Sequence, residues 1–311
     1  MMAAPRSAKV DVVSELFPHV LNVIAADADA LAGPIRAAVA ANGAADEIRW
    51  LSNERAFDIP FLGTPESICA AAREVAGGLS ADINVVASAH RRKKLLIADM
   101  DSTIISCECL DELADMAGLK PRIAAITERA MRGEIAFEPA LRERVGLLKG
   151  LRLDALEHTM HERVKLNPGA MELVATMRRH GAATLLVSGG FTFFTLRVAQ
   201  QAGFDEQQAN VLLNDGEHLT GKVKEPILGR EAKLAALEEA AAARSLEFEQ
   251  TLAVGDGAND LAMIQRAGLG VAYHAKPIVA EAAGARIDHG DLKALLYLQG
   301  YRDDEIVGAQ A

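Results

Sequence analysis

The chain contains the stretch KKLLIADMDST at residues 93–103, in which a short apolar run leads directly into two carboxylates, Asp99 and Asp101. Such a run between lysines and acids is typical of a buried strand that enters a loop. In an open parallel sheet, the carboxyl ends of the strands face the crevice where ligands bind. Two acids there need a cation, and a hard oxygen site of this kind suits Mg²⁺. The alternative is an ordinary solvated turn, because Asp, Ser and Thr are common turn formers.

The composition is that of a globular protein with a large core. The chain has 311 residues, of which 50% are hydrophobic and 24% are charged, so we expect two or three structural units. Its formal net charge of −10 argues against nucleic-acid binding, which needs a clustered basic face. The basic block Arg91-Arg92-Lys93-Lys94 is interpreted as the solvated end of a linker.

Neither a membrane span nor a secretory signal is evident in the sequence. No stretch reaches the roughly 18 apolar residues that a spanning helix needs, and the N-terminus lacks a basic region followed by an apolar core. Three cysteines, Cys69, Cys107 and Cys109, have no pattern that completes a metal site. We therefore expect a cytoplasmic protein with free thiols.

Residues 1–90 show a compact alternation of strand and helix patterns. The expected strands cover residues 19–26, 47–53, 55–60 and 82–87, and the expected helices cover residues 29–41 and 64–75, with Thr64 as an N-cap. The order β-α-β-β-α-β is that of a ferredoxin-like α+β unit. This unit contains no catalytic constellation, so it is either a regulatory or dimerising module or a structural appendage.

Residues 91–311 are predicted to form an α/β domain with a helical insertion at about residues 105–165. Apolar residues repeat at helical spacing over residues 111–116, 123–131, 137–148 and 155–163, with glycines between them. An all-helical insertion between two sheet strands suggests a lid. Asn167 and Pro168 are expected to cap and start the next helix, which Gly181 would end.

Two later apolar strands also end in loops whose residues could bind phosphate or a metal ion. The strand at residues 182–187 ends in Ser188-Gly189-Gly190, whose hydroxyl and main-chain N–H groups can donate to phosphate. Lys233 lies on a helix that begins near Gly229. The strand at residues 251–254 runs into GDGAND at residues 255–260, a second candidate magnesium-binding loop. Short strands near residues 270–273 and 285–288 and a helix from Asp291 would finish the sheet, and the residues after Arg302 are expected to form a loose tail.

Four motifs occur in the order that defines a known superfamily. They are DMDST (99–103), strand-terminal Ser188, helical Lys233 and GDGAND (255–260). In this the chain resembles the haloacid dehalogenase superfamily, which implies a Rossmann-like core with a helical cap. The additional matches Glu108, FEPALRERV (137–145), SGGF (188–191) and VGDGAND (254–260) resemble, more narrowly, the phosphoserine phosphatase family. Bacterial members often carry an ACT-like regulatory domain, to which residues 1–90 are similar in element order.

The resemblance implies a role for each motif residue. Asp99 would be the nucleophile that forms an aspartyl-phosphate, and Asp101 the acid that protonates the departing serine oxygen and later deprotonates water. Mg²⁺ would be held by the carboxylates of Asp99 and Asp256 and by the main-chain carbonyl of Asp101. The remaining implied roles are a phosphate cradle of Ser188, Gly189 and Lys233, a phosphate or substrate donor in Asn259, and a supporting carboxylate in Asp260, which would orient Lys233 or a metal-bound water.

The predicted lid supplies residues for the serine part of the substrate. Glu108 can face the ammonium, and Arg144 offers the planar fork that binds a carboxylate. Met131 and Phe137 would close over the short carbon stem and exclude water. The alternative is that Glu108 is a helix N-terminal acid favoured by the dipole and Arg144 a solvated helix residue.

The expected function is Mg²⁺-dependent hydrolysis of O-phosphoserine, the last step of serine biosynthesis, by an enzyme with no nucleic-acid or membrane partner. One alternative is a phosphatase or phosphotransferase for another small phosphomonoester, for example one that uses homoserine as acceptor. Another is a receiver-like module that takes phosphate as a signal. Asp101 and the lid speak against a receiver, which lacks both. A homodimer, an effector of the N-terminal unit and the choice between L- and D-phosphoserine are left open.

Overall fold

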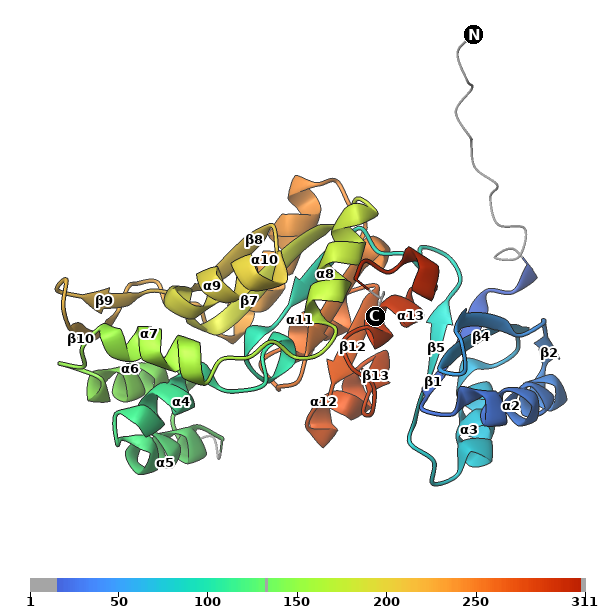
Figure 1. The fold of residues 1–311 in the computed structure, drawn as a ribbon, viewed down its shortest axis with the longest axis horizontal. Coiled ribbons are helices and arrows are strands. Elements are labelled where there is room, and N and C mark those ends of the chain that lie inside the picture. The colour runs from blue at the N-terminus through green and yellow to red at the C-terminus, as the bar shows by residue number, and fades with distance from the viewer. Residues whose placement is uncertain (1–15, 132–133, 309–311) are drawn as a thin grey trace, which may run out of the picture.

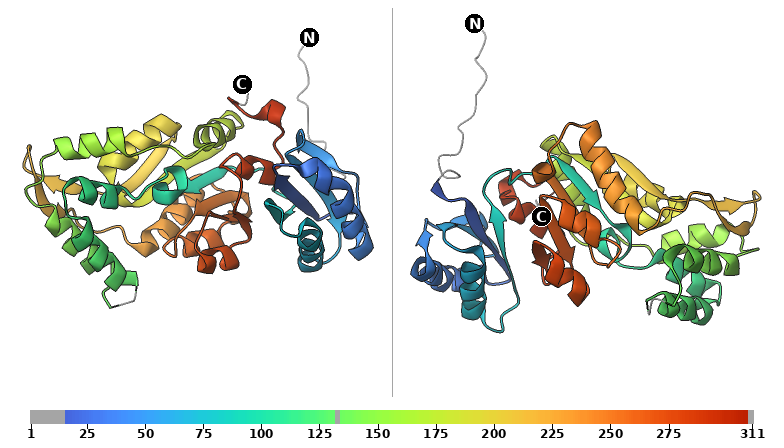
Figure 2. Two further views of the ribbon diagram at one scale, coloured as in Figure 1. Left: turned by 60° about the horizontal axis from the view of Figure 1, so that its bottom comes forward. Right: turned by 180° about the vertical axis from the view of Figure 1, so that it is seen from behind.

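The computed structural model describes residues 16–131 and 134–308. These residues form a small α+β unit at the N-terminal end and a larger α/β unit that carries a helical cap (Figure 1). The small unit lies at the edge of the larger one, on the side opposite the cap, as Figure 2 shows from two further directions. The predicted fold class is thereby confirmed.

The N-terminal unit is a ferredoxin-like sheet with two helices on one face. It consists of β1 (His19–Ala25), α2 (Ala28–Asn42), β2 (Ala44–Ala45), β3 (Arg49–Ser52), β4 (Ala56–Leu62), α3 (Pro65–Ala76) and β5 (Ala81–Ala87). The strands run antiparallel in the order β5-β1-β4, with β2 and β3 both paired to β4. Alternate residues such as Leu21, Val23 and Phe57 face the helices and are buried. Thr64 occupies the predicted N-cap position of α3, although its side chain makes no capping hydrogen bond.

The opposite face of this sheet packs on the larger unit through polar side chains. Asn84 on β5 exchanges two 2.9 Å hydrogen bonds with the main chain of Arg286, which lies in the edge strand of the larger sheet. Asp82 accepts hydrogen bonds from the main-chain N–H groups of Asp288 and Gly290, both at 2.7 Å. Because strand side chains alternate between faces, one set of residues forms the small core and the other set forms this interface.

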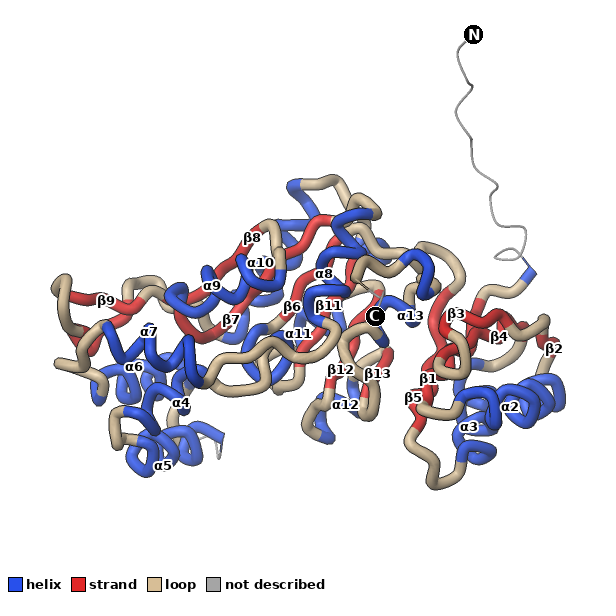
Figure 3. Tube along the Cα trace, viewed as in Figure 1, coloured by secondary structure: helices blue, strands red, loops and turns tan. Residues whose placement is uncertain are grey.

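The larger unit is built on a six-stranded parallel sheet in the order β13-β12-β11-β6-β7-β8. The strands are β6 (Leu95–Ala98), β7 (Ala183–Phe191), β8 (Glu206–Asn210), β11 (Thr251–Gly255), β12 (Leu269–Tyr273) and β13 (Ala285–Ile287). The helices that cover the sheet are α8 (Ala170–Arg179), α9 (Thr192–Ala202), α10 (Arg230–Ala243), α11 (Leu261–Arg266), α12 (Pro277–Ala282) and α13 (Ala294–Leu298). Leu95 and Ile97 cluster with α10, α11 and α12, whereas Leu96 and Ala98 cluster with α8, α9 and α13. The sheet is therefore buried on both faces, as Figure 3 shows.

The cap leaves the sheet after the first loop and returns before α8. Its described part contains the helices α4 (Cys109–Met116), α5 (Lys120–Met131), α6 (Phe137–Leu147) and α7 (Asp154–Glu162), close to the predicted spans. A hairpin of β9 (Leu212–Asn214) and β10 (Leu219–Val223) reaches from the sheet to this cap. There the Gly150 N–H donates to the Leu219 carbonyl, and the Leu219 N–H donates to the Leu151 carbonyl, both at 2.8 Å. The sequence analysis missed this hairpin.

Three local predictions are wrong. The helix after the cap begins at Ala170 with Gly169 as its N-cap, because Asn167 is bonded to the first loop instead. The segment after Arg302 is not a loose tail, since Ile306 is buried and the Val307 N–H donates to Thr176 Oγ1 at 2.9 Å. The basic block at residues 91–94 is not uniformly solvated, because Lys93 is buried and Arg91 is half-buried.

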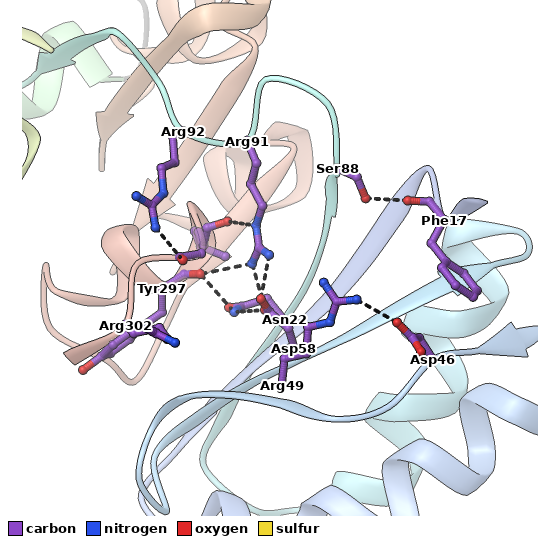
Figure 4. Close-up of polar contacts among 12 residues, drawn as sticks. Phe17, Asn22, Asp46, Arg49, Asp58, Ser88, Arg91, Arg92, Tyr297 and Arg302 are labelled. Carbon is purple, nitrogen blue, oxygen red and sulfur yellow. Dashed lines mark hydrogen bonds and ion pairs between the residues drawn. The ribbon is translucent and has the colours of Figure 1, made fainter. Parts of the chain in front are cut away.

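Figure 4 shows how this basic block joins the two units. Arg91 forms a bidentate ion pair with Asp58 on β4, with N···O distances of 2.6 and 2.8 Å. Asn22 on β1 donates to the same carboxylate at 2.8 Å and to the Tyr297 carbonyl at 3.2 Å.

Among the helices of residues 16–131 and 134–308, none combines the length and the apolar character that a membrane span requires.

Candidate active site

The site lies where β6 ends between its two neighbours in the sheet, β11 and β7. The Asp99 N–H still donates to the Val254 carbonyl of β11, so the strand pairing continues up to this residue. The chain then turns sharply, with Ser102 at a φ of 55° and the Ile105 N–H bonded to the Met100 carbonyl at 3.0 Å. This turn, which we call the 99–105 loop, separates the environments of Asp99 and Asp101.

Hydrogen bonds also fix the 99–105 loop to the segment that returns from the cap. Asn167 Nδ2 donates to the carbonyls of Thr103 and Ile105 at 2.7 and 3.2 Å. The Ser106 N–H donates to the Lys165 carbonyl at 3.0 Å. The two crossings between sheet and cap are thus held side by side at the edge of the site.

Asp99 belongs to a group of three carboxylates. One oxygen each of Asp99, Asp256 and Asp260 lie within 4.8 Å of one another. Lys233 on α10 contacts two of them, with Nζ at 2.6 Å from Asp99 Oδ1 and at 2.5 Å from Asp260 Oδ1. When all are ionised, three carboxylates and one ammonium leave two negative charges. Oxygen donors with that charge fit a divalent cation such as Mg²⁺.

The electrostatics of the group follow from crowding and burial. Burial, followed by the Asp260 carboxylate, raises the pKa of Asp99 well above its ordinary value, although Lys233 acts in the opposite direction. The pKa of Asp256 is raised by the same two causes. Burial alone would lower the pKa of Lys233, but the carboxylates of Asp99 and Asp260 outweigh it and raise that pKa, so the lysine is a permanent cation.

Asp101 faces a different environment from Asp99. Its Oδ1 accepts a hydrogen bond from the Cys109 N–H at 2.9 Å, and its Oδ2 accepts one from Ser188 Oγ at 3.0 Å. Its carboxylate is not part of the three-carboxylate group. Burial raises the pKa of Asp101, which favours the protonated form that a general acid needs.

The last residues of β7 and the loop after β11 bring the other predicted residues to the same place. Ser188 Oγ accepts a hydrogen bond from the Gly190 N–H at 2.8 Å, beside its contact with Asp101. The side chain of Asn259 reaches Asp260 Oδ1 at 3.5 Å. The Gly257 N–H donates to Asp260 Oδ2 at 3.1 Å, so Asp260 is held from its own loop as well as by Lys233.

The cap contributes an acid, an arginine and an aromatic ring. Ser102 Oγ donates to Glu108 Oε1 at 2.7 Å. Partial desolvation, followed by the nearby Asp101, raises the pKa of Glu108 to about 7, although Glu108 is exposed at the surface. Arg144 on α6 is half-buried, and burial lowers its pKa against the opposing effect of Asp111 and Glu108. Phe137, the first residue of α6, lies against Gly189, where an added Cβ would meet the ring at 3.4 Å.

Comparisons with known proteins identify the family of the chain. Residues 96–265 match the model of the haloacid dehalogenase-like hydrolases, which is more than half of the chain. The chain belongs to this family. The matched span includes every predicted site residue, from Asp99 to Asp260.

Individual members of the haloacid dehalogenase-like hydrolases show how far the similarity extends. The chain is 48% identical over 210 residues to the phosphoserine phosphatase of Polaromonas sp. strain JS666, which covers 66% of this chain and 89% of that protein. Among solved structures, a family hydrolase of Salmonella enterica serovar Typhi has a TM-score of 0.80 at 29% identity and covers 90% of this chain and 97% of its own. A probable phosphoserine phosphatase of Vibrio cholerae has a TM-score of 0.77 at 31% identity and covers 91% and 86%.

Two residues of this haloacid dehalogenase-like hydrolase were given no role from the sequence, although Thr103 belongs to the quoted motif DMDST. Asn210, buried at the end of β8, donates through Nδ2 to the Gly189 carbonyl at 2.9 Å and to the Leu228 carbonyl at 3.1 Å, and its Oδ1 accepts from the Leu228 N–H at 2.7 Å. Thr103 Oγ1 donates to Asp256 Oδ1 at 3.3 Å. Each ends a strand or follows one, which is the positional signal that could have identified it. The side chain of Met131 lies outside the described residues.

Proposed function

We propose that this chain hydrolyses free O-phosphoserine to serine and inorganic phosphate, through a phosphoryl group carried on Asp99. The observation that supports this most is that two carboxylates only two residues apart have different surroundings. Asp99 lies against Lys233 and the other two acids, whereas Asp101 is hydrogen-bonded to Ser188 and the Cys109 N–H. The relatives named phosphoserine phosphatase support the choice of substrate.

In the first half-reaction, an Asp99 oxygen forms a bond to phosphorus while the bond from phosphorus to the serine oxygen breaks. That oxygen needs a proton, because a serine alkoxide is a poor leaving group, and Asp101 supplies it. In the second half-reaction, Asp101 takes a proton from water as the water oxygen attacks phosphorus. Phosphate leaves and the Asp99 carboxylate is restored. A raised pKa suits Asp101 for both proton transfers.

Magnesium is the cofactor that we propose for this chemistry. The carboxylates of Asp99 and Asp256 and the main-chain carbonyl of Asp101 would hold it, since the first two belong to the three-carboxylate group. When bound, Mg²⁺ would keep the nucleophile ionised and neutralise charge on the phosphoryl oxygens. Asp260 has a separate task, because it shares Lys233 with Asp99 and so fixes the position of the ammonium.

The phosphoryl oxygens would be held by donors from the end of β7, from α10 and from the loop after β11. We assign the Ser188 hydroxyl, the Gly189 N–H, the Lys233 ammonium and the Asn259 amide to this cradle. Phosphoryl transfer depends mainly on positioning and charge stabilisation, so fixed donors are the main requirement. Phe137 of the cap lies next to Gly189, where an added Cβ would be in van der Waals contact with the ring.

The cap residues would recognise the serine part of the substrate. We propose that Glu108 binds the ammonium and Arg144 the carboxylate, with Phe137 and Met131 over the carbon stem. The electrostatic effect of Glu108 on Arg144 is consistent with two opposite charges facing one small volume. A desolvated charge pair of this kind discriminates strongly between substrates that carry the matching groups and those that do not.

One assay separates this function from its alternatives. Purified protein is incubated with O-phosphoserine and Mg²⁺, with and without homoserine, and serine, phosphate, O-phosphohomoserine and protein-bound phosphate are measured. Equal release of serine and phosphate over many turnovers is expected, and Asp99→Asn serves as the inactive control. Transfer to homoserine in place of hydrolysis would establish a phosphotransferase. Stable protein-bound phosphate without turnover would establish a receiver-like module.

The organisation around this enzyme activity is also proposed. Residues 1–90 would form an ACT-like unit and residues 91–311 the phosphatase, with the cap at about residues 105–165. The N-terminal unit lies at the sheet edge distant from the cap, which favours a regulatory or assembly role for this unit over a direct catalytic one. A cytoplasmic location and a homodimer stay predictions.

A further inference from the structure

The two crossings between the sheet and the cap form a short antiparallel ribbon beside the active site. Ile105 leads from the site into the cap and Leu166 returns from it, and these two residues pair as an isolated antiparallel bridge. The Asn167 N–H then donates to the Ile104 carbonyl at 2.8 Å. The returning segment is therefore fixed against the end of the 99–105 loop.

Asn167 binds three consecutive carbonyls of this loop. Its side-chain amide donates to the Thr103 carbonyl at 2.7 Å and to the Ile105 carbonyl at 3.2 Å. Its main-chain N–H donates to the Ile104 carbonyl, which lies between them in the chain. Successive carbonyls of an extended chain point to opposite sides, so one residue reaches all three only because the loop is turned here. Both N–H donors of the amide are used, and Asn167 thereby holds this turn.

The first of the three carbonyls belongs to a residue that contacts the group of three carboxylates. Thr103 is fully buried, and its Oγ1 donates to Asp256 Oδ1 at 3.3 Å. Within residues 16–131 and 134–308, the Asp256 carboxylate accepts no other side-chain hydrogen bond. Threonine is branched at Cβ and has few rotamers, so the direction of its hydroxyl follows its main chain. A displaced main chain at Thr103 would therefore release the Asp256 carboxylate.

We propose that Asn167 is a positioning residue of the magnesium site and that it acts through Thr103 on Asp256. The inference rests on the proposed function, in which Asp256 is a magnesium ligand. Asn167 would touch neither the ion nor the substrate, because its amide donors are directed at the loop carbonyls. Since Asn167 lies on the segment that returns from the cap, the same contacts would connect the cap to the metal site.

Magnesium binding without substrate tests this role. The affinity is measured from the rise in Tm with MgCl₂, relative to NaCl at equal ionic strength, in the wild type, Asn167→Ala and Asn84→Ala. Asn84→Ala is the matched control, because it also removes an amide that makes two hydrogen bonds to the main chain, at the interface between the units. We expect an affinity about tenfold lower in Asn167→Ala and unchanged in Asn84→Ala, since partners of metal ligands typically change metal affinity by this amount.

Two outcomes of this titration would overturn the inference while the proposed cofactor stands. They are equal affinities in the wild type and Asn167→Ala, and an equal loss in Asn84→Ala. No Mg²⁺ binding by the wild type would overturn the proposed cofactor and this inference together. Asn167→Ser is the milder variant, and its hydroxyl can donate to one carbonyl. Its affinity should lie between those of the wild type and Asn167→Ala, and an affinity equal to that of the wild type would contradict the role of the amide.

A double-mutant cycle tests the route through Thr103. Thr103→Val removes the hydroxyl, keeps the shape of the side chain and leaves the carbonyl that Asn167 binds. If both residues act through Asp256, the double variant should bind Mg²⁺ within about threefold of the weaker single variant. Losses that multiply would show that Asn167 acts by another route. Saturating Mg²⁺ should also restore most of kcat in Asn167→Ala, and a kcat that stays low at every Mg²⁺ concentration would contradict a role at the metal site.

Discussion

Lys233 and Asp99 form a buried ion pair, with Nζ 2.6 Å from Oδ1, at the end of the strand β6. The lysine side chain is 3% exposed and that of Asp99 is 7% exposed. The same ammonium holds Asp260, so one cation from α10 keeps two acids from separate loops in contact. The arrangement of the candidate nucleophile thus depends on a residue more than a hundred positions away in the chain.

Replacement of Lys233 by Met should therefore lower the free energy of unfolding. Removing one partner of a buried ion pair leaves uncompensated charge, which costs about 3–5 kcal/mol. Urea denaturation of Lys233→Met and of the exposed control Lys149→Met measures this, with and without Mg²⁺. We expect a large loss only in Lys233→Met, partly recovered by Mg²⁺. A midpoint equal to that of the control would show that the pair contributes little to stability.

The pH dependence of kcat/KM tests the role of Glu108. The carboxylate form binds an ammonium, and this form predominates above the pKa of about 7. Hence kcat/KM for phosphoserine should fall about tenfold per pH unit as the pH decreases below 7, whereas p-nitrophenyl phosphate should lack this dependence. In Glu108→Gln the acidic limb for phosphoserine should disappear together with most of the activity. The same limb for both substrates would assign it to another group.

Arg144→Ala separates substrate recognition from chemistry. Loss of a desolvated charged pair should lower kcat/KM for phosphoserine by about 2 kcal/mol or more, while p-nitrophenyl phosphate, which has no amino-acid carboxylate, should be hydrolysed almost as before. Arg142→Ala is a suitable control, because Arg142 lies on the same helix and its ion pairs with Glu138 and Glu225 are exposed. Equal losses on both substrates would mean that Arg144 supports the fold.

Asn210 should position the phosphate cradle without touching the substrate. Its amide ties the Gly189 carbonyl to Leu228, just before the helix that carries Lys233. Asn210→Ala should lower kcat by about a hundredfold through a small displacement of these donors, with little change in KM. Asn210→Asp, which can still accept from the Leu228 N–H, should lose less. A change confined to thermal stability would reduce Asn210 to a structural role.

The sequence was sufficient to predict which side chains meet at the site where a motif directly follows its strand in the chain. Asp99, Asp101, Ser188 and Asp256 follow apolar runs, and parallel strands bring their ends together. It was insufficient where the partners are distant. Asn210 has no local motif, and its role depends on contacts with two other loops.

The interface between the two units shows a second reason why some contacts could not be predicted from the sequence. Asn22, Asp82 and Asn84 occupy alternate positions on their strands, a pattern that also describes a solvated face. Their partners are Asp58 and main-chain groups near residues 286–290 and 297, which no local pattern connects to them. Arg91 and Lys93 were likewise taken as solvated, because four consecutive basic residues usually are.

Asp99 is the proposed carrier of the phosphoryl group, and trapping the covalent intermediate identifies the residue that carries it. The enzyme is quenched with acid during turnover of phosphoserine and reduced with borohydride, which converts an acyl phosphate on aspartate to homoserine. Peptide mass spectrometry then locates the modified residue. We expect it at Asp99 in the wild type and nowhere in Asp99→Asn, whose turnover should be abolished. Modification at another residue, or turnover of Asp99→Asn within about tenfold of the wild type, would contradict the proposed mechanism.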